Sequence, residues 1–248
     1  MLRKAIDSFI GALGMFTRLP VPYHPLLEDS LSLLLCYPLV GAVAGGLWYG
    51  LWLLCFRLGL SILIGGALLC LFPLLITGFM HMDGFMDVMD ALLSGRSREK
   101  RLVILKDPNT GAFSVCAFGC LLLLQFVACA DLYGRGWYGP GLICLPIFSR
   151  SVSALCLTCP PMLEGSTLGR AFGSRAGTGA KAWFALWALL SAAGLVWTTG
   201  IIWVPITAGA ASLLGLLWAM QGLGGSSGDV AGFCLVLAEV AGLIAMSL

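Results

Sequence analysis

Three aspartates occupy one short stretch of the sequence at spacings that suit metal binding. Asp83, Asp87 and Asp90 are four and three residues apart, and residues at these spacings are neighbours on one face of a helix. Like charges so placed repel one another, and no lysine or arginine shares this face. Either solvent screens the carboxylates or a divalent cation lies among them, and the missing basic partners favour a cation. Oxygen ligands suit magnesium, so we predict that all three bind Mg²⁺ and act in catalysis.

Three more candidates lie beside this acidic stretch. His81 precedes or begins the same helix on its far side, and we interpret it as a general base or a substrate contact. Lys106 and Asp107 open a turn bounded by a proline and a glycine. A lysine there would hold a phosphate whose other oxygens contact the metal, so we predict a catalytic role for Lys106 and substrate binding for Asp107. The basic run 95–101 is interpreted as an anchor at lipid headgroups.

Two further groups of residues are candidates for substrate binding. Residues 222–229 form a glycine-rich stretch before the last apolar segment. Backbone N–H groups at such a helix start attract phosphate, which makes Gly225 and Asp229 candidates, although Asp229 could instead add a carboxylate to the metal site. Arg150 and Glu239 lie within apolar segments, where charges are costly and commonly functional. They either pair structurally or take part in catalysis, and we count Arg150 as substrate-binding.

The composition requires a membrane protein to carry these residues. Of 248 residues, 59% are hydrophobic and only 10% are charged, against about 25% charged in soluble domains. A soluble fold, a disordered chain and a nucleic-acid binder are thereby excluded. The 10 cysteines lie mostly singly in apolar runs, where a thiol packs as a small hydrophobic group.

The apolar runs predict an all-α, polytopic membrane protein with about seven transmembrane helices. Spans of about 20 residues cross the hydrocarbon layer as helices. We expect a single membrane domain over 1–248, an amphipathic N-terminal segment and close helix contacts at Gly41-x-x-x-Gly45. The expected spans, the first of which we expect to tilt or bend at Pro38, are 31–56, 59–79, 112–132, 138–158, 181–199, 201–220 and 230–248.

The positive charges predict an orientation. Lysine and arginine gather before the first span, after the second and after the fourth, whereas the opposite connections contain only Arg57 and Arg135. The positive-inside rule then places the amino terminus in the cytoplasm. The active site, built from 77–111, 160–181 and 221–229, falls on the same face. We therefore expect a multi-pass protein of the cytoplasmic (inner) membrane.

Several sequence blocks, in order along nearly the whole chain, resemble the cobalamin synthase (adenosylcobinamide-GDP ribazoletransferase) family. The most specific is His81-Met-Asp-Gly-Phe-Met-Asp-Val-Met-Asp90, which matches the family core H-x-D-G-x-x-D-x-x-D. The other matching blocks are 16–22, 37–41, 106–111, 149–150, 164–165 and 224–229. The chain departs from the family pattern at Phe79, where the family usually has a second glycine after Thr-Gly, and at Val236, where it often has an acid.

The resemblance implies a phosphotransferase of vitamin B12 assembly. Adenosylcobinamide-GDP would react with α-ribazole or its 5′-phosphate, giving adenosylcobalamin or its 5′-phosphate and GMP. Phosphoryl transfer mainly needs positioning and charge neutralisation, which the three aspartates with Mg²⁺ would supply together with Arg18, Lys106 and Arg150. His81 or one aspartate would accept the proton. The expected partners are the two substrates and the lipid bilayer, with no nucleic acid; a homo-oligomer or contact with other enzymes of the pathway is also possible.

Two other functions remain as alternatives. A CDP-alcohol phosphotransferase also uses spaced aspartates and Mg²⁺, but its longer motif is missing from this sequence. A proton- or cation-coupled transporter would use Asp83, Asp87, Arg150 and Glu239 as a relay. Transporters commonly show internal repeats and charges near the membrane midplane, whereas the acids here cluster at one edge and no repeat is visible.

Overall fold

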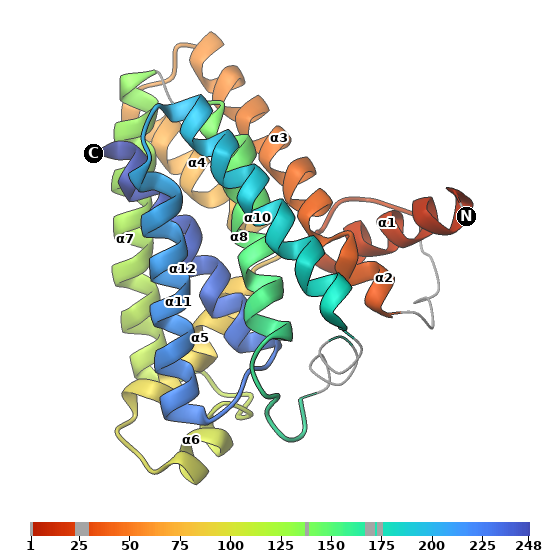
Figure 1. Cartoon of the computed structure of the whole chain (residues 1–248). Helices are drawn as coiled ribbons and strands as arrows, with labels where there is room; N and C mark the ends of the chain where they lie inside the picture. Colours follow the sequence, from red (N-terminus) through yellow and green to blue (C-terminus); the bar gives the residue numbers. More distant parts are fainter. Residues whose placement is uncertain (1, 23–29, 137–138, 167–171, 173–175) are drawn as a thin grey trace.

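The computed structural model is a bundle of helices (Figure 1) and describes residues 2–22, 30–136, 139–166, 172 and 176–248. Arg170 and Arg175, which contribute to the predicted orientation, lie outside these residues. The predicted all-α membrane architecture is confirmed. The helices are α1 (Leu2–Phe16), α2 (Ser30–Leu35), α3 (Tyr37–Arg57), α4 (Ile62–Ile76), α5 (Met80–Leu93), α6 (Arg98–Ile104), α7 (Ala112–Arg135), α8 (Gly141–Thr158), α10 (Thr178–Thr199), α11 (Trp203–Leu223) and α12 (Gly228–Ser247).

Six of the described helices are long and apolar enough to cross a membrane alone, and a bent pair makes a seventh candidate. The six are α3, α7, α8, α10, α11 and α12. The seventh is α4 followed by α5, with an 88° bend between them. At 1.5 Å per residue, α4 is only about 22 Å long, shorter than the hydrocarbon layer.

The first two predicted spans were wrong in detail. The span predicted at 31–56 is divided at Cys36, since α2 ends at Leu35 and α3 begins at Tyr37 with a proline in its first turn. A proline at a helix start cannot continue the preceding helix. The span predicted at 59–79 is interrupted after Ile76, because the chain there turns sharply into the acidic helix.

The turn between α4 and α5 depends on two residues with left-handed backbone. Gly78 and Phe79 have φ of 59° and 63°, and Phe79 is the one non-glycine residue with positive φ among those described. A side chain in this region costs about 1–2 kcal/mol. This is the position where the resembling family usually has glycine, so the departure at Phe79 leaves a strained backbone where glycine would be unstrained.

Helix α12 lies at the centre of the bundle. It packs against α5, α7, α8 and α11. Of its most apolar 18-residue stretch, 78% is buried inside the protein. In α8 the buried share of the corresponding stretch is 72%, whereas in α10 and α11 it is less than a third. The exposed faces of the outer helices carry large apolar side chains such as Leu189 and Leu214. In a membrane protein these are the faces that contact lipid.

Helices α3 and α8 are in close backbone contact, as the Gly41-x-x-x-Gly45 spacing predicts. A Cβ atom on Gly41 would lie 2.5 Å from the carbonyl oxygen of Pro146, and one on Gly45 would lie 2.5 Å from that of Ile143. Only glycine leaves room for such an approach, which is typical of small-residue helix contacts in membranes. This prediction is confirmed.

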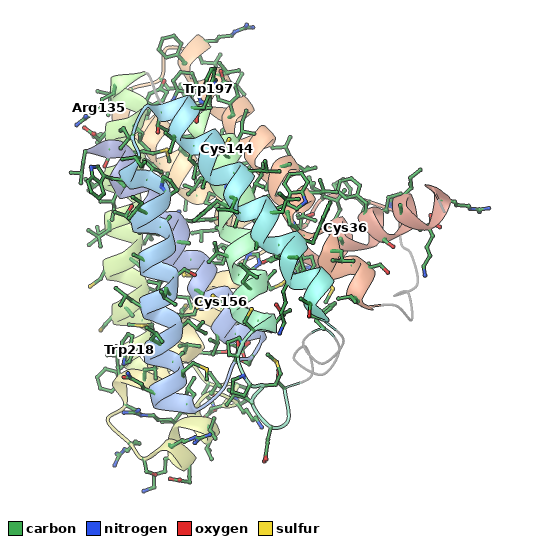
Figure 2. The ribbon with its side chains drawn as sticks, in the orientation of Figure 1. Cys36, Arg135, Cys144, Cys156, Trp197 and Trp218 are labelled. Atoms are coloured by element: carbon green, nitrogen blue, oxygen red, sulfur yellow. The ribbon has the colours of Figure 1, made fainter. Side chains whose placement is uncertain are left out.

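The two ends of the bundle differ in character. The α3–α4 and α10–α11 connections lie together at the upper end in Figure 1, near Arg135, the last residue of α7, and Trp197 in Figure 2. Trp197 is 91% exposed, and tryptophans are enriched at membrane–water interfaces. The lower end carries α6, the connection from α11 to α12 and the described residues that directly follow α8. The described parts of the segments assigned to the active site from sequence therefore lie toward one end.

We expect Gly45→Ala to destabilise the protein in detergent by about 1–3 kcal/mol, because the added methyl group meets the α8 backbone. Thermal inactivation of the purified protein would measure it. Gly46→Ala is the matched control, since nothing lies within 4 Å of a Cβ there. Equal stability of the two variants would contradict the close α3–α8 contact.

Candidate active site

The acidic stretch forms α5 and presents its three aspartates away from the core. Asp83 is exposed, and Asp87 and Asp90 are half-buried. The remaining faces of α5 are packed inside the protein through His81, Met82, Gly84, Phe85, Val88, Ala91 and Leu92. Asp83 and Asp90 are both close enough to Asp87 to repel its charge. The predicted acidic face therefore exists as a set of mutually repelling carboxylates.

A fourth carboxylate joins this face from α12. Asp229 lies in the first turn of α12 and also acts on the charge of Asp87. It approaches α5 at Gly84, where a Cβ atom would lie 2.9 Å from the Cα of Asp229. Ser227 caps α12 by accepting from the backbone N–H of Val230, and its hydroxyl donates to Asp229 at 3.3 Å. Gly84 in the acidic motif thus lets the two helices meet.

The four aspartates suit a magnesium ion that arrives with a substrate better than a preformed metal cage. Within the described residues, no three His, Cys, Asp or Glu side chains converge closely enough to hold a metal by themselves. The Asp90 carboxylate, for example, lies directly against Gly111 at the start of α7. Mg²⁺ typically takes one or two carboxylates and completes its shell with water and substrate phosphates. The residues present fit that mode of binding.

An outer cavity of about 300 Å³ opens beside Asp229. Its polar lining comes from three connections: Lys106 follows α6, Glu164 and Ser166 follow α8, and Ser227 and Asp229 begin α12. The Lys106 ammonium group lies beside Gly165. One cation, Lys106, and two carboxylates, Glu164 and Asp229, therefore line the same cavity.

Asp107 and the basic run hold the surrounding connections in place. Asp107 is exposed and accepts hydrogen bonds from the backbone N–H and the side-chain amide of Asn109, which lower its pKa. Arg98 donates through Nε to the carbonyl oxygen of Leu223 at 2.8 Å and packs on Gly224. In this structure the run 95–101, interpreted from sequence as a lipid anchor, also holds the loop that leads to Asp229.

The glycine-rich loop before α12 is fixed by backbone contacts. Ser226 pairs with Met162 in a parallel bridge, and its hydroxyl donates to the carbonyl oxygen of Cys156. Gly225 is buried against the backbone of Leu163, where a Cβ would lie 2.9 Å from its nitrogen. This pairing joins the α8–α10 connection to the start of α12, and so aligns Glu164 and Asp229 across the outer cavity.

A second cavity of about 80 Å³, called here the inner cavity, is also lined by Asp229 and by the buried residues around His81. His81 is buried at its wall, and its Nε2 shares a hydrogen bond of 2.8 Å with the hydroxyl group of Tyr37. Which of the two groups donates depends on the tautomer of the imidazole ring. Tyr37 thereby sets the orientation of the ring.

Arg150 forms a buried ion pair behind this wall. It is 1% exposed and donates to Glu239 at 2.9 Å, while the hydroxyl of Ser149 donates to the same carboxylate oxygen at 2.8 Å. Its guanidinium carbon lies 5.9 Å from the centre of the Tyr37 ring. Of the two interpretations open from sequence, the structure shows the pairing of Arg150 with Glu239.

Arg18 is the remaining predicted site residue. It is exposed, its backbone N–H donates to the carbonyl oxygen of Ile76, and its side chain lies against Gly78. The cation is therefore placed at the turn that begins the acidic helix.

Comparison with known proteins finds relatives that match nearly the whole chain. The family model described as "Cobalamin-5-phosphate synthase" matches residues 8–247. The chain belongs to this family.

Relatives named adenosylcobinamide-GDP ribazoletransferase include one from Clostridium botulinum (strain Alaska E43 / Type E3), 38% identical over 100% of this chain and 99% of the relative. Another, from Clostridium perfringens (strain 13 / Type A), is 35% identical over 99% of this chain and 98% of the relative. A third, from Pseudomonas paraeruginosa, is 34% identical over the full length of both. No solved structure matches the chain.

The family confirms the resemblance inferred from the sequence blocks. As a member, the protein is a transferase of cobalamin biosynthesis, and its helices make it a multi-pass membrane protein. The sequence blocks that carry the resemblance lie on α3, α5, α8 and α12, after α1, and on the connections before α7, after α8 and before α12.

Several site residues had no assigned role in the sequence analysis. Tyr37 contacts His81 from 44 positions away, Glu164 lines the outer cavity and Arg98 holds the loop before α12. Tyr37 and Glu164 lie within family-like blocks but carry no chemical signal of their own. Arg98 belongs to a run whose charge alone suits lipid equally well.

We expect Gly84→Ala to lower the kcat/KM of the transferase by roughly tenfold or more, because the added methyl group pushes Asp229 away from the acidic face. Release of the nucleotide product would be measured. Gly119→Ala on α7 is the control, with nothing within 4 Å of its Cβ. Unchanged kinetics in a correctly inserted Gly84→Ala protein would show that the α5–α12 contact does not matter for catalysis.

Proposed function

We propose that the protein is a Mg²⁺-dependent phosphotransferase that joins adenosylcobinamide-GDP to α-ribazole or α-ribazole 5′-phosphate. The products are adenosylcobalamin or its 5′-phosphate, and GMP. The names of the relatives and the description of the family support these substrates. The description of the family refers to a phosphorylated product, and the names of the relatives refer to ribazole. Both acceptors present a ribose hydroxyl as the nucleophile, so one site can serve either.

The observation that carries the proposal is the meeting of α5 and α12. It brings Asp229 to the face formed by Asp83, Asp87 and Asp90, beside the cavity that contains Lys106. Four carboxylates without a bound cation repel one another, whereas a pyrophosphate with Mg²⁺ supplies both the positive charge and the remaining oxygen ligands. When bound, Mg²⁺ would neutralise the charge that develops on the phosphoryl oxygens and the leaving group.

The reaction forms one P–O bond and breaks another. The acceptor oxygen attacks the phosphorus on the cobinamide side, and the bond from that phosphorus to the GMP oxygen breaks. Lys106 and Arg18 hold the phosphate charge, and the hydroxyl proton passes to His81 or to one of the aspartates. Arg150 acts from behind Tyr37 and keeps the wall of the site in place, since its guanidinium is paired with Glu239.

The site also suits the cytoplasmic side of the inner membrane. The end of the bundle that carries it includes α6, and the sequence in and around α6 is rich in lysine and arginine. Such residues are retained on the cytoplasmic side. Its nucleotide substrate would be available from that side.

We expect Asp87→Asn to abolish turnover and leave the protein inserted and folded. The amide cannot supply the negative charge that the cation needs, and Asp87 is the carboxylate on which the other three act. GMP release in detergent from adenosylcobinamide-GDP and α-ribazole would be measured. Asp131→Asn is the control, because Asp131 pairs with Arg135 on an exposed part of α7. Near-normal activity of purified Asp87→Asn protein would refute the metal assignment.

We expect EDTA to stop GMP release and Mg²⁺ to restore it, because no three described side chains form a closed cage that would retain the ion. The thermal stability of the chelated protein should change little, which separates loss of metal from unfolding. Full activity in a thoroughly chelated sample would rule out the requirement for a divalent cation.

A further inference from the structure

Two cavities meet at the start of α12. The outer cavity contains Lys106, and the inner cavity contains His81; both are lined by Gly228 and Asp229. A ligand that extends past Asp229 would therefore have one part in each. The two cavities differ in chemistry, so they suit different parts of the substrates.

The inner cavity is apolar and aromatic. Phe16, Phe172 and Tyr37 line it, together with Leu34, Ala154 and Leu157, and each of these side chains is less than 9% exposed. Flat aromatic ligands gain from such walls through burial and ring contacts. With a volume of about 80 Å³, the cavity is well below the several hundred Å³ of a complete ligand site. It suits one ring system of a larger molecule.

The polar groups of the inner cavity are few, and most already have partners. Tyr37 and His81 share one hydrogen bond, and the hydroxyl of Ser153 donates to the carbonyl oxygen of Ala231. A ligand placed there can expect one or two hydrogen bonds at most. The outer cavity, by contrast, offers charged and hydroxyl groups from three connections.

We infer that the inner cavity binds the aromatic base of the acceptor nucleoside, with the ribose directed past Asp229 into the outer cavity. This inference rests on the proposed function. It places a ribose hydroxyl of the acceptor at the junction between the two cavities, beside the aspartates and next to the phosphates held at Lys106. The nucleophile from one cavity and the phosphorus in the other would then meet beside Asp229.

The other aromatic parts of the substrates fit the inner cavity less well. A guanine base carries donors and acceptors along its edges, and burying them without partners costs about 1–3 kcal/mol each. A corrin ring is much larger than a cavity of about 80 Å³. A benzimidazole-type base has an apolar edge and one ring-nitrogen acceptor, which matches a wall with few polar groups.

The test fills or enlarges the inner cavity. Ala154→Leu places extra methyl groups in it, and we expect the KM for α-ribazole to rise about tenfold or more, with the KM for adenosylcobinamide-GDP within about twofold of wild type. Leu157→Ala enlarges it, and we expect a shift in preference toward nucleosides with a bulkier base. Leu195→Ala is the matched control, because Leu195 is equally buried but belongs to the second core cluster and lines neither cavity.

Equilibrium dialysis of α-ribazole with the purified protein, without the second substrate, separates this inference from the proposed function. Wild-type binding that is lost in Ala154→Leu supports the inference. Equal binding by both proteins, or equal effects of Leu157→Ala and Leu195→Ala on base preference, overturns it and leaves the proposed function standing. If wild type releases no GMP from the two substrates, the proposed function fails, whatever the dialysis shows. If Ala154→Leu does not fold, the pair Leu157→Ala and Leu195→Ala decides.

Discussion

The site depends on the 88° turn between α4 and α5. A straight continuation of α4 would carry the aspartates along the lipid-facing helix, whereas the turn directs α5 onto α12 in the interior. Two residues with left-handed backbone make the turn, and the hydroxyl of Thr77 donates to the carbonyl oxygen of Pro73 at its start. The strain at Phe79 is offset by the burial of the apolar faces of α5 against α7 and α12. Such local strain commonly accompanies functional sites.

A buried series of polar side-chain contacts supports the site from behind. Glu239 on α12 accepts from Arg150 on α8, whose cation lies near the Tyr37 ring on α3, and Tyr37 bonds to His81 on α5. Burying an ion pair brings little net stability, but removing one partner leaves a costly unpaired charge. These contacts therefore hold α3, α5, α8 and α12 in one arrangement. They link the orientation of His81 to residues deep in the bundle.

Repulsion and cavity chemistry together explain why the site occupies this end of the bundle. The four aspartates need a cation or solvent, and the end bearing α6 offers both an opening and the ammonium group of Lys106. The apolar inner cavity lies where the same helices close against Phe16 and Phe172. Gly228 and Asp229 border both environments because both cavities reach the first turn of α12.

Much of this arrangement follows from local sequence. Apolar runs of the required length specify membrane helices wherever they occur, the i, i+4 and i+7 spacing puts three aspartates on one face, and the glycine spacing in α3 permits close packing. These are properties of neighbouring residues along one helix, so a sequence contains them. The ordered motif blocks likewise indicate the family without any structure.

The tertiary structure alone decided which distant residues meet. The proximity of Asp229 to Asp87, the Tyr37–His81 hydrogen bond and the Arg150–Glu239 pair each join segments more than 40 residues apart. The interruption of the second predicted span was equally hidden, because hydropathy measures length and apolar character but not direction. A bend in the backbone leaves the composition unchanged, yet it determines whether a helix crosses the bilayer or turns inward to form the site.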